Sequence, residues 1–280
     1  MEATEIIVAL GPHRYRTIRR WGNLPEGSKL REMSKLAVDS QGDVYVYQRT
    51  DPPVVVFDRE GRYARSFGKG LVADPHGIFI SPDDRVWLVD RGGHQVLICD
   101  RLGNLLFTVG ERHHANFQAP FNHPADVAVA ANGDFYVADG YGNSMVHWFG
   151  PEGELRKSWG RPGQGPGQFV TPHGIGVLID GRVIVGDREN NRIQVFSPEG
   201  DYLTEWHDLY KPMDIYVDPR GLIYVSDQVP RLTMLTAEGE VVGRCMATPK
   251  EGHGVRGDPQ GNFYIAETVY DYVIKLERLA

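Results

Sequence analysis

The chain has 280 residues, of which 41% are hydrophobic and 24% charged, a composition typical of a folded globular protein rather than a disordered one. Lys and Arg total 30 against 37 Asp and Glu, and this formal net charge of −7 argues against binding to nucleic acid or to an anionic membrane. The two cysteines, Cys99 and Cys245, are too few for a disulfide framework and lack the spacing of a cysteine zinc site.

The first residues, MEATEIIVALGPHRYR, contain an apolar run of five residues. Such a run is too short for the apolar region of a signal peptide or for a membrane span. We therefore expect a cytoplasmic protein with free thiols and no membrane association.

Short alternating apolar runs, separated by glycine and proline turns, recur along the whole chain and predict many short strands. Six runs share one pattern, in which two turn residues precede an aromatic and aliphatic run that ends in an acid or amide. In chain order they are DSQGDVYVYQ, SPDDRVWLVD, AANGDFYVAD, IDGRVIVGD, DPRGLIYVSD and DPQGNFYIAE. Their last residues, 40 to 49 positions apart, are Gln48, Asp90, Asp139, Asp187, Asp227 and Glu267. This period is typical of propeller blades.

Further apolar runs follow each acid and give four strands per repeat, which predicts an all-β, six-bladed β-propeller in a single domain over residues 1–280. Two packed β-sandwiches would not need six equivalent units. The sixth repeat stops early, and residues 15–22 offer the missing strand, so we expect the N-terminal strand to close the last blade. The expected blades are 34–70, 75–112, 123–162, 171–208, 211–247, and 252–280 together with 15–22.

The first strand of each blade lines the central channel, so the residues at its start form a ring around the axis. These six positions hold Lys35, His76, Ala125, His173, Met213 and His253. Histidine occupies alternate blades, so three imidazoles converge on the axis and leave a fourth coordination position open, as in catalytic zinc sites. We expect a divalent metal there, zinc first, with iron, nickel and copper also suited to three imidazoles. The alternative is that the histidines only hydrogen-bond to carbonyl groups in a polar channel.

The residues that follow each repeat's acid lie near the same rim. They are Arg49, Arg91, Gly140, Arg188, Gln228 and Thr268, with Tyr141 one position further in the third repeat. An arginine can hold a carboxylate and a tyrosine can exchange a proton, so we expect a small-molecule substrate that bears a carboxylate. Arg49 and Arg188 are the candidates, whereas Arg91 is expected to form a structural ion pair.

Two acids of the inner strands, Asp126 and Asp214, are expected either to orient histidine N–H groups or to brace turns.

The segments PHGIFI, HPADVAVAANGDFYVADGYGNS, GPGQFVTPHGIGV and DRENNRIQVF, within residues 75–196, resemble in order and spacing the peptidyl-α-hydroxyglycine α-amidating lyases, which are six-bladed propellers of NHL repeats. The resemblance implies that His76, His173 and His253 bind a catalytic zinc. It also implies catalytic roles for Arg49, Tyr141 and Arg188. Lyases of this family split the C–N bond of an α-hydroxyglycine and release glyoxylate and an amide.

The resemblance is consistent with a mechanism in which the metal and an arginine hold the substrate while Tyr141 or a metal-bound hydroxide removes the hydroxyl proton. Three positions depart from the family pattern. Glu251 stands where the family has methionine, Gly254 where it has an acid, and Gly142 where it has a cysteine. The missing acid predicts that the family's structural Ca²⁺ site is altered or absent. A small cytosolic α-hydroxy amide or a related acid is therefore expected rather than a peptide.

Two other classes of function stay open. A metal-dependent lactonase or other hydrolase could use the same axial metal, and release of glyoxylate would distinguish the lyase from it. A non-catalytic NHL scaffold would present its outer rim to a partner, because a fold alone does not fix a function. The sequence specifies neither the physiological substrate nor an oligomeric state.

Overall fold

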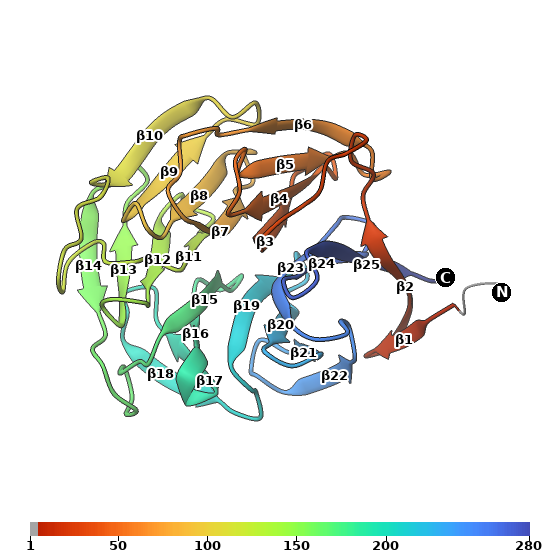
Figure 1. Ribbon diagram of the computed structural model, residues 1–280. Coiled ribbons are helices and arrows are strands. Elements are labelled where there is room, and N and C mark those ends of the chain that lie inside the picture. The colour runs from red at the N-terminus through yellow and green to blue at the C-terminus, as the bar shows by residue number, and fades with distance from the viewer. Residues whose placement is uncertain (1–4) are drawn as a thin grey trace.

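The structure is a computed structural model that describes residues 5–280. Within these residues the chain forms 25 β-strands and one short 3-10 helix, η1 (Arg188–Asn190). The strands make six separate sheets arranged around a central axis (Figure 1). The predicted all-β, six-bladed propeller is therefore confirmed. Among the described residues, no helix is long and apolar enough to cross a membrane.

Five of the blades consist of four consecutive antiparallel strands, ordered from the axis outward. The first three of these blades contain β3 (Met33–Val38), β4 (Val44–Gln48), β5 (Val54–Phe57) and β6 (Tyr63–Phe67); β7 (Pro75–Ile80), β8 (Val86–Asp90), β9 (Gln95–Cys99) and β10 (Leu105–Gly110); and β11 (Asp126–Val129), β12 (Phe135–Asp139), β13 (Met145–Phe149) and β14 (Leu155–Trp159). The next two contain β15 (Pro172–Val177), β16 (Val183–Asp187), β17 (Arg192–Phe196) and β18 (Tyr202–Trp206); and β19 (Pro212–Val217), β20 (Ile223–Asp227), β21 (Leu232–Leu235) and β22 (Val241–Cys245).

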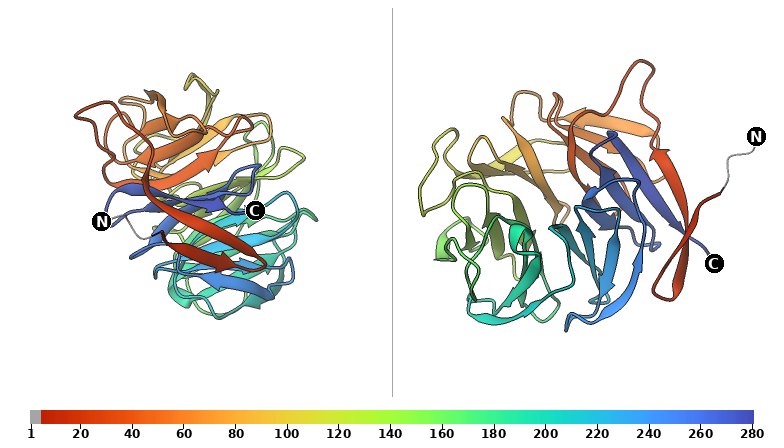
Figure 2. Two further views of the ribbon diagram at one scale, coloured as in Figure 1. Left: turned by 90° about the vertical axis from the view of Figure 1, so that its right-hand side faces the viewer. Right: turned by 60° about the horizontal axis from the view of Figure 1, so that its bottom comes forward.

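The sixth blade joins the two ends of the chain. Its strands β23 (Gly252–Gly257), β24 (Phe263–Glu267) and β25 (Tyr272–Arg278) are completed by β2 (His13–Trp21), which pairs antiparallel with β25. The expected closing strand at residues 15–22 is thus confirmed. A strand that the sequence did not predict, β1 (Ile7–Leu10), adds a fifth member outside β2. Both views in Figure 2 show the red N-terminal strands beside the dark-blue strands of the C-terminal segment.

The strand sequences follow from where each strand lies in its blade. Neighbouring blades pack face to face, so central strands such as β4 (VYVYQ) are buried along their whole length. Outer strands such as β14 (LRKSW) keep an exposed polar face. The closure is packed as well, because the ring of Trp21 lies 5.8 Å from that of Phe57 and 4.7 Å from that of Tyr264. Aromatic packing therefore joins the sixth blade to the first.

The acid that ends each repeat holds the loop that leads into the inner strand of its own blade. Its carboxylate accepts a hydrogen bond from a backbone N–H of that loop. In the three blades that carry histidine at the axis, the pairs are Asp90 with Asp74 (2.9 Å), Asp187 with Val170 (2.8 Å), and Glu267 with Lys250 (3.3 Å). The repeated acid therefore fixes the chain just before each of these histidines.

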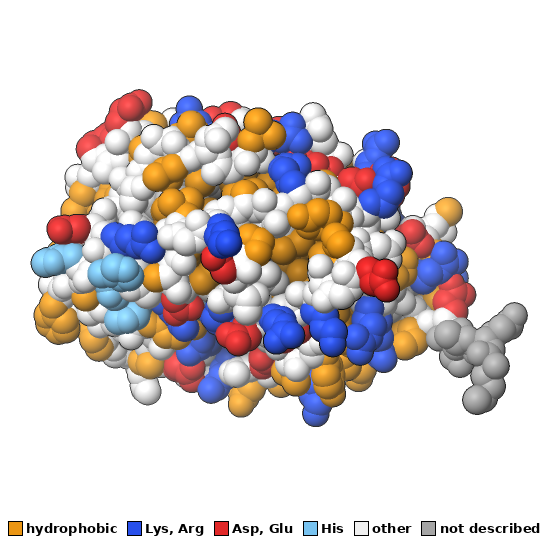
Figure 3. Space-filling model, turned by 45° about the horizontal axis from the view of Figure 1, so that its top comes forward, with side chains coloured by type: hydrophobic (Ala, Val, Ile, Leu, Met, Phe, Trp, Pro, Cys, Tyr) orange, Lys and Arg blue, Asp and Glu red, His pale blue; other side chains and the backbone are white. Residues whose placement is uncertain are grey.

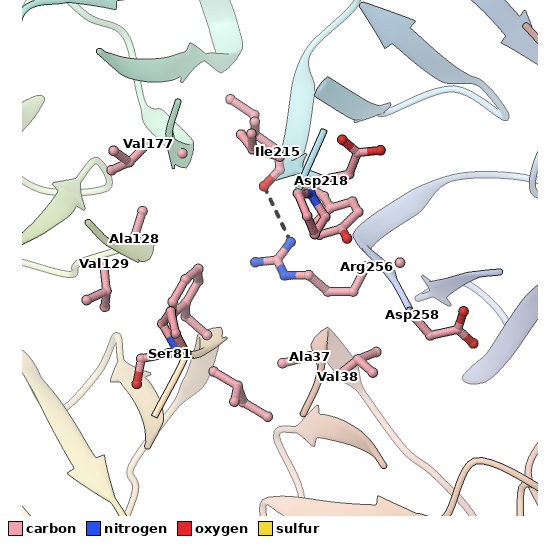
Figure 4. A pocket seen from close by; sticks show the side chains of 18 of the residues that line it. Ala37, Val38, Ser81, Ala128, Val129, Val177, Ile215, Asp218, Arg256 and Asp258 are labelled. Carbon is pink, nitrogen blue, oxygen red and sulfur yellow. Dashed lines mark hydrogen bonds between the residues drawn. The ribbon is translucent and has the colours of Figure 1, made fainter. Parts of the chain in front are cut away.

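The far ends of the inner strands surround a cavity of about 850 Å³ (Figure 4). Its walls are largely apolar and include Val38, Ala128, Val129, Val177 and Ile215. The side chain of Arg256 reaches into it from β23. The lining of this cavity includes none of the three axial histidines.

Candidate metal centre

Three histidines meet on the axis of the propeller. His76, His173 and His253 are each the second residue of an inner strand, in β7, β15 and β23. Their ring centroids lie 4.8, 5.0 and 5.1 Å apart, and one nitrogen from each lies within 4.8 Å of the others. The structure thus brings together the three imidazoles at the positions that the repeat register predicts. We call them the histidine ring.

The second nitrogen of each ring histidine is fixed by a backbone carbonyl from the neighbouring blade. The Nδ1 atoms donate to carbonyl oxygens in three pairs: His76 to Ala125 (2.7 Å), His173 to Met213 (2.6 Å), and His253 to Ser34 (3.0 Å). Since a carbonyl can only accept, Nδ1 carries the proton and Nε2 keeps its lone pair. The two alternatives for the histidines are therefore compatible. The Nδ1 atoms bind carbonyl groups, and the Nε2 atoms remain available to a metal.

The protonation of the ring histidines also suits a metal. Burial lowers the pKa of His76 and of His173 well below the ordinary value, with further lowering from neighbouring positive groups. Burial likewise lowers the pKa of His253 to about 3. Metal binding requires neutral imidazole. Three neutral Nε2 donors on one axis therefore fit a divalent ion with a fourth position open to a ligand.

Tyr141 and Arg188 lie against the histidine ring. Tyr141 Oη is 3.0 Å from His76 Nε2 and 3.1 Å from His173 Nε2, and Arg188 donates from Nη1 to the same oxygen over 3.2 Å. The Arg188 guanidinium also lies 5.3 Å from the centre of the tyrosine ring. Its Nε donates to Glu189 over 2.9 Å, and Glu189 in turn pairs with Lys211. The structure thus joins two of the predicted catalytic residues to the ring.

Arg49 pairs with an acid that the sequence analysis did not identify. Its Nε donates to Asp74 Oδ1 over 3.2 Å, and Asp74 lies two residues before His76. Arg91 binds the other oxygen of Asp74 at 2.7 Å. Asp74 therefore bridges the two arginines at the edge of the site.

Arg91 has a place in the site beyond the structural ion pair expected for it. Its guanidinium lies 4.8 Å from the centre of the Tyr141 ring, on the approach to the histidines. Its register, which it shares with Arg49 and Arg188, could have identified it. No common residue marks the position of Asp74, because the equivalent positions, two residues before the other ring histidines, hold Thr171 and Glu251.

Asp126 and Asp214 lie beneath the histidine ring and do not contact its N–H groups, which are taken by carbonyls. Both carboxylates instead bind the ammonium group of Lys35 at 2.8 Å. They also accept hydrogen bonds from the N–H groups of Ile175 and Val255 in neighbouring inner strands. The expectation that they bind histidine N–H groups is therefore wrong, and so is the alternative that they brace turns.

The positions that depart from the lyase pattern have local structural reasons. A Cβ at Gly254 would lie 2.9 Å from Lys35 Cα, so the inner strand of the first blade leaves no room for an acid there. A Cβ at Gly142 would lie 2.3 Å from Asn122 Cγ, so a cysteine does not fit either. Glu251 accepts a hydrogen bond from Thr268 over 3.0 Å.

His147, in the third blade, is a buried histidine outside the ring. His147 of β13 is fully buried and contacts Asp139 (3.1 Å) and Ser158 (2.7 Å). His147 links the repeat acid Asp139 to Ser158 of the outer strand, so it belongs to the structure of the blade rather than to the site.

Comparisons with known proteins agree with the repeat and with the resemblance. The NHL repeat model matches residues 121–149 and 169–196. A Caenorhabditis elegans protein named "Probable peptidyl-alpha-hydroxyglycine alpha-amidating lyase" is 37% identical over 156 residues, which cover 53% of this chain and 45% of that protein. Human NHL repeat-containing protein 3 is 33% identical over 223 residues, which cover 72% of this chain and 64% of that protein. The matches thus span about half to two thirds of these relatives.

Among solved structures, a Xanthomonas campestris gluconolactonase has a TM-score of 0.70 at 12% identity, with 99% of this chain and 96% of that chain covered. At this identity the likeness concerns the fold alone. The chain is a six-bladed propeller that carries NHL repeats in residues 121–149 and 169–196 and is similar in sequence to proteins named peptidyl-alpha-hydroxyglycine alpha-amidating lyase.

Proposed function

We propose that the protein is a metal-dependent lyase that cleaves the C–N bond of an α-hydroxyglycine-type substrate. The observation that carries the proposal is the position of Tyr141 Oη, within 3.2 Å of two ring histidines and of Arg188. The sequence similarity to proteins named amidating lyase supports the same reaction class.

His76, His173 and His253 would hold the metal through Nε2. When bound, a divalent ion such as zinc supplies a Lewis acid that polarises the substrate hydroxyl and favours its loss of a proton. The carbonyl partners of Nδ1 hold the three rings in the tautomer that this role requires.

The arginines would bind the substrate carboxylate. Arg188 and Arg49 each use Nε for a protein carboxylate, Glu189 and Asp74 respectively, and terminal nitrogens stay available for a bidentate contact. Held in this way, the substrate presents its α-hydroxyl to Tyr141.

Tyr141 would move the proton. As a phenolate held by the Arg188 guanidinium, Tyr141 would take the hydroxyl proton while the O–H electron pair forms the new C=O bond. The C–N bond breaks at the same time and its electron pair goes to the nitrogen, which receives that proton from Tyr141, so that the amide forms and the phenolate is restored. The other product is glyoxylate or a related α-oxo acid, so atoms and charge balance without an oxidant or a second substrate.

The proposal includes a cytoplasmic location and a small-molecule partner, with no binding to nucleic acid or membrane. Cys99 and Cys245 form no disulfide, which suits a reducing compartment such as the cytoplasm. On the face shown in Figure 3, positive and negative side chains are interspersed rather than gathered into a basic patch. Such a surface suits a soluble enzyme of small molecules.

The test combines metal analysis with product analysis. Untagged protein purified without chelator is analysed by plasma mass spectrometry beside the His173→Ala variant. His207→Ala is the matched control, because His207 is exposed just after the outer strand β18. We expect about one equivalent of metal in the parent and control and its loss in His173→Ala. The same samples are assayed for glyoxylate from a benzoylated α-hydroxyglycine. Absence of metal after incubation with zinc, iron or manganese would refute the proposal.

A metal-dependent lactonase is the second candidate, favoured by the shared fold with a gluconolactonase and by an axial triad that could activate water. An aldonolactone assayed on the same samples distinguishes the two. Acid release from the lactone without glyoxylate from the hydroxyglycine would replace the lyase with the hydrolase.

A further inference from the structure

Four charged side chains lie on the axis directly beneath the histidine ring. They are Lys35 of β3, Asp126 of β11, Asp214 of β19 and Arg256 of β23, which we call the axial cluster. Lys35 Nζ lies 2.8 Å from both Asp126 Oδ2 and Asp214 Oδ1, and Arg256 Nη1 lies 2.8 Å from Asp214 Oδ2. The first three side chains are completely buried. Two cations and two carboxylates balance in formal charge.

The cluster is linked through the backbone to the partners of the ring histidines. The three carbonyls that receive the Nδ1 protons belong to Ser34, Ala125 and Met213. Each of these residues directly precedes a member of the cluster: Lys35, Asp126 and Asp214. An ion pair that draws the three side chains together therefore also sets the three carbonyls, one residue away.

The same layer holds the strands that carry the histidines. Asp126 Oδ2 accepts from the N–H of Ile175, two residues after His173, over 3.2 Å. Asp214 Oδ2 accepts from the N–H of Val255, two residues after His253, over 2.8 Å. In the third case Ser34 Oγ donates to the carbonyl of His76 itself over 2.7 Å. Every histidine strand is thus bound to an adjacent strand that carries a cluster residue.

These buried ion pairs need not stabilise the fold, because the cost of desolvating buried charges commonly cancels their attraction. What they do provide is a fixed geometry. Among the described residues, Lys35 is the only hydrogen-bond partner that Asp126 and Asp214 share, and Asp126 Oδ1 has no hydrogen-bond partner. Lys35 therefore decides whether the first, third and fifth blades meet at one point.

We propose that the axial cluster, with Lys35 at its centre, positions the three ring histidines for metal binding by fixing the carbonyls that orient them. The cluster residues are positioning residues, since none of them contacts the metal ligands' Nε2 atoms. The inference rests on the proposed metal site, but its structural part can be tested on the metal-free protein.

The test uses Lys35→Met, which keeps a long apolar side chain and removes the ammonium. Because that change leaves a carboxylate uncompensated, a charge-balanced variant, Lys35→Met with Asp126→Asn, is made as well. It retains the Asp214–Arg256 pair and an oxygen at position 126 for the N–H of Ile175. Lys157→Met is the matched control, because Lys157 lies exposed on outer strand β14.

The first readout needs no metal. Long-range ¹H–¹⁵N spectra of labelled protein report the histidine tautomers and the exchange of the Nδ1 protons. We expect three ring histidines with slowly exchanging Nδ1 protons in the parent and in Lys157→Met, and at least about tenfold faster exchange in the charge-balanced variant. Parent-like exchange in a folded charge-balanced variant would overturn the proposal.

The second readout is the affinity for Co²⁺, measured in competition with a chelator. Loss of the orienting layer is expected to weaken binding by about 10- to 100-fold, with a changed absorption spectrum, in the charge-balanced variant and not in the control. An unchanged affinity and spectrum would overturn the inference. If the parent binds no metal, the proposed function fails, while the exchange measurement still decides whether the cluster orients the histidines.

Discussion

Arg188 Nη1 and Tyr141 Oη lie 3.2 Å apart, and the same oxygen faces the Nε2 atoms of two axial histidines. Tyr141 is about one third exposed whereas His76 and His173 are fully buried, so the phenol stands between solvent and the histidine ring. A molecule that approaches the ring meets this oxygen and this guanidinium first. The pair therefore controls access to the metal position as well as the chemistry proposed for it.

Tyr141→Phe removes that oxygen and keeps the ring. We expect the rate of glyoxylate release to fall by about 100- to 10,000-fold, the usual contribution of a positioned acid or base. Metal content should be unchanged, since the three ring histidines are the proposed ligands. Tyr210→Phe, at an exposed tyrosine, is the control. A Tyr141→Phe enzyme with parental kcat would show that another group moves the proton.

Asp74→Asn is expected to loosen both Arg49 and Arg91, because the Asp74 carboxylate bridges them. Carboxylate binding should suffer more than the chemical step, with KM raised about tenfold or more and metal content retained. Steady-state kinetics separate the two parameters. Asp180→Asn is the control, since Asp180 pairs with Arg182 at the surface. A fall in kcat alone would contradict the binding role.

Asp227 gives a pH dependence of stability. Burial raises the pKa of its carboxyl to about 6 despite the nearby Arg231, and its Oδ1 has no hydrogen-bond partner within the described residues. Since the folded-state pKa is above the unfolded one, the stability from this group is complete below about pH 4 and is lost as the pH rises to about 6.

Asp227→Asn removes that titration. The free energy of unfolding of the variant, relative to that of the parent, should rise by on the order of 2 kcal/mol from pH 4 to pH 7. Urea unfolding at four pH values measures the difference. Asp201→Asn, at an exposed carboxylate, should show a flat difference. A flat difference for Asp227→Asn too would mean that its carboxyl ionises at an ordinary pH.

The two thiols should be unreactive in the native protein. Burial raises the pKa of Cys99 to about 11 and that of Cys245 to about 12, and the thiolate is the reactive form. At pH 8 we expect a disulfide reagent to label neither thiol in the time in which it labels both in urea. Absorbance at the reagent's product band counts the thiols. Rapid labelling of one native thiol would show that its blade opens.

Removal of the metal should leave the propeller folded. The apolar core is divided among six clusters, which contain none of the ring histidines. Circular dichroism should therefore be unchanged in a chelator. The melting temperature should fall, because the chelator removes a binding contribution to the free energy of unfolding of about 3 kcal/mol at a free metal concentration about 100 times Kd. Loss of β-structure on chelation would assign the metal a structural role.

The periodic part of the structure could be predicted because it is encoded locally. Each repeat carries its own turn, strand pattern and acid, so the register of the runs ending at Asp90, Asp187 and Glu267 places histidine at equivalent positions. The sixth repeat lacks its last strand and residues 15–22 supply one, and this was a sufficient signal for closure of the last blade. Strand β1 has no equivalent in the repeat and could not be predicted from it.

The contacts between blades could not be predicted in the same way. Asp74 meets Arg49 and Arg91 from two different blades, and no spacing along the chain records that encounter. The assignment of Lys35 to the ring position of the first blade was wrong by one residue. Met33 pairs with Gln48 as Pro75 pairs with Asp90, so Ser34 is the counterpart of His76 and Lys35 lies one residue further along the strand. Lysine is also rarely fully buried. Only the three-dimensional arrangement shows that it finds two carboxylates on the axis.

The axial cluster closes the central channel of the propeller. Lys35, Asp126 and Asp214 are wholly buried between the histidines and the large cavity at the far end, whose floor is Arg256. The charged side chains of the axial cluster therefore block the central channel between its two ends. A molecule that reaches the histidines must therefore pass Tyr141, and both products of the proposed cleavage would leave by the same route.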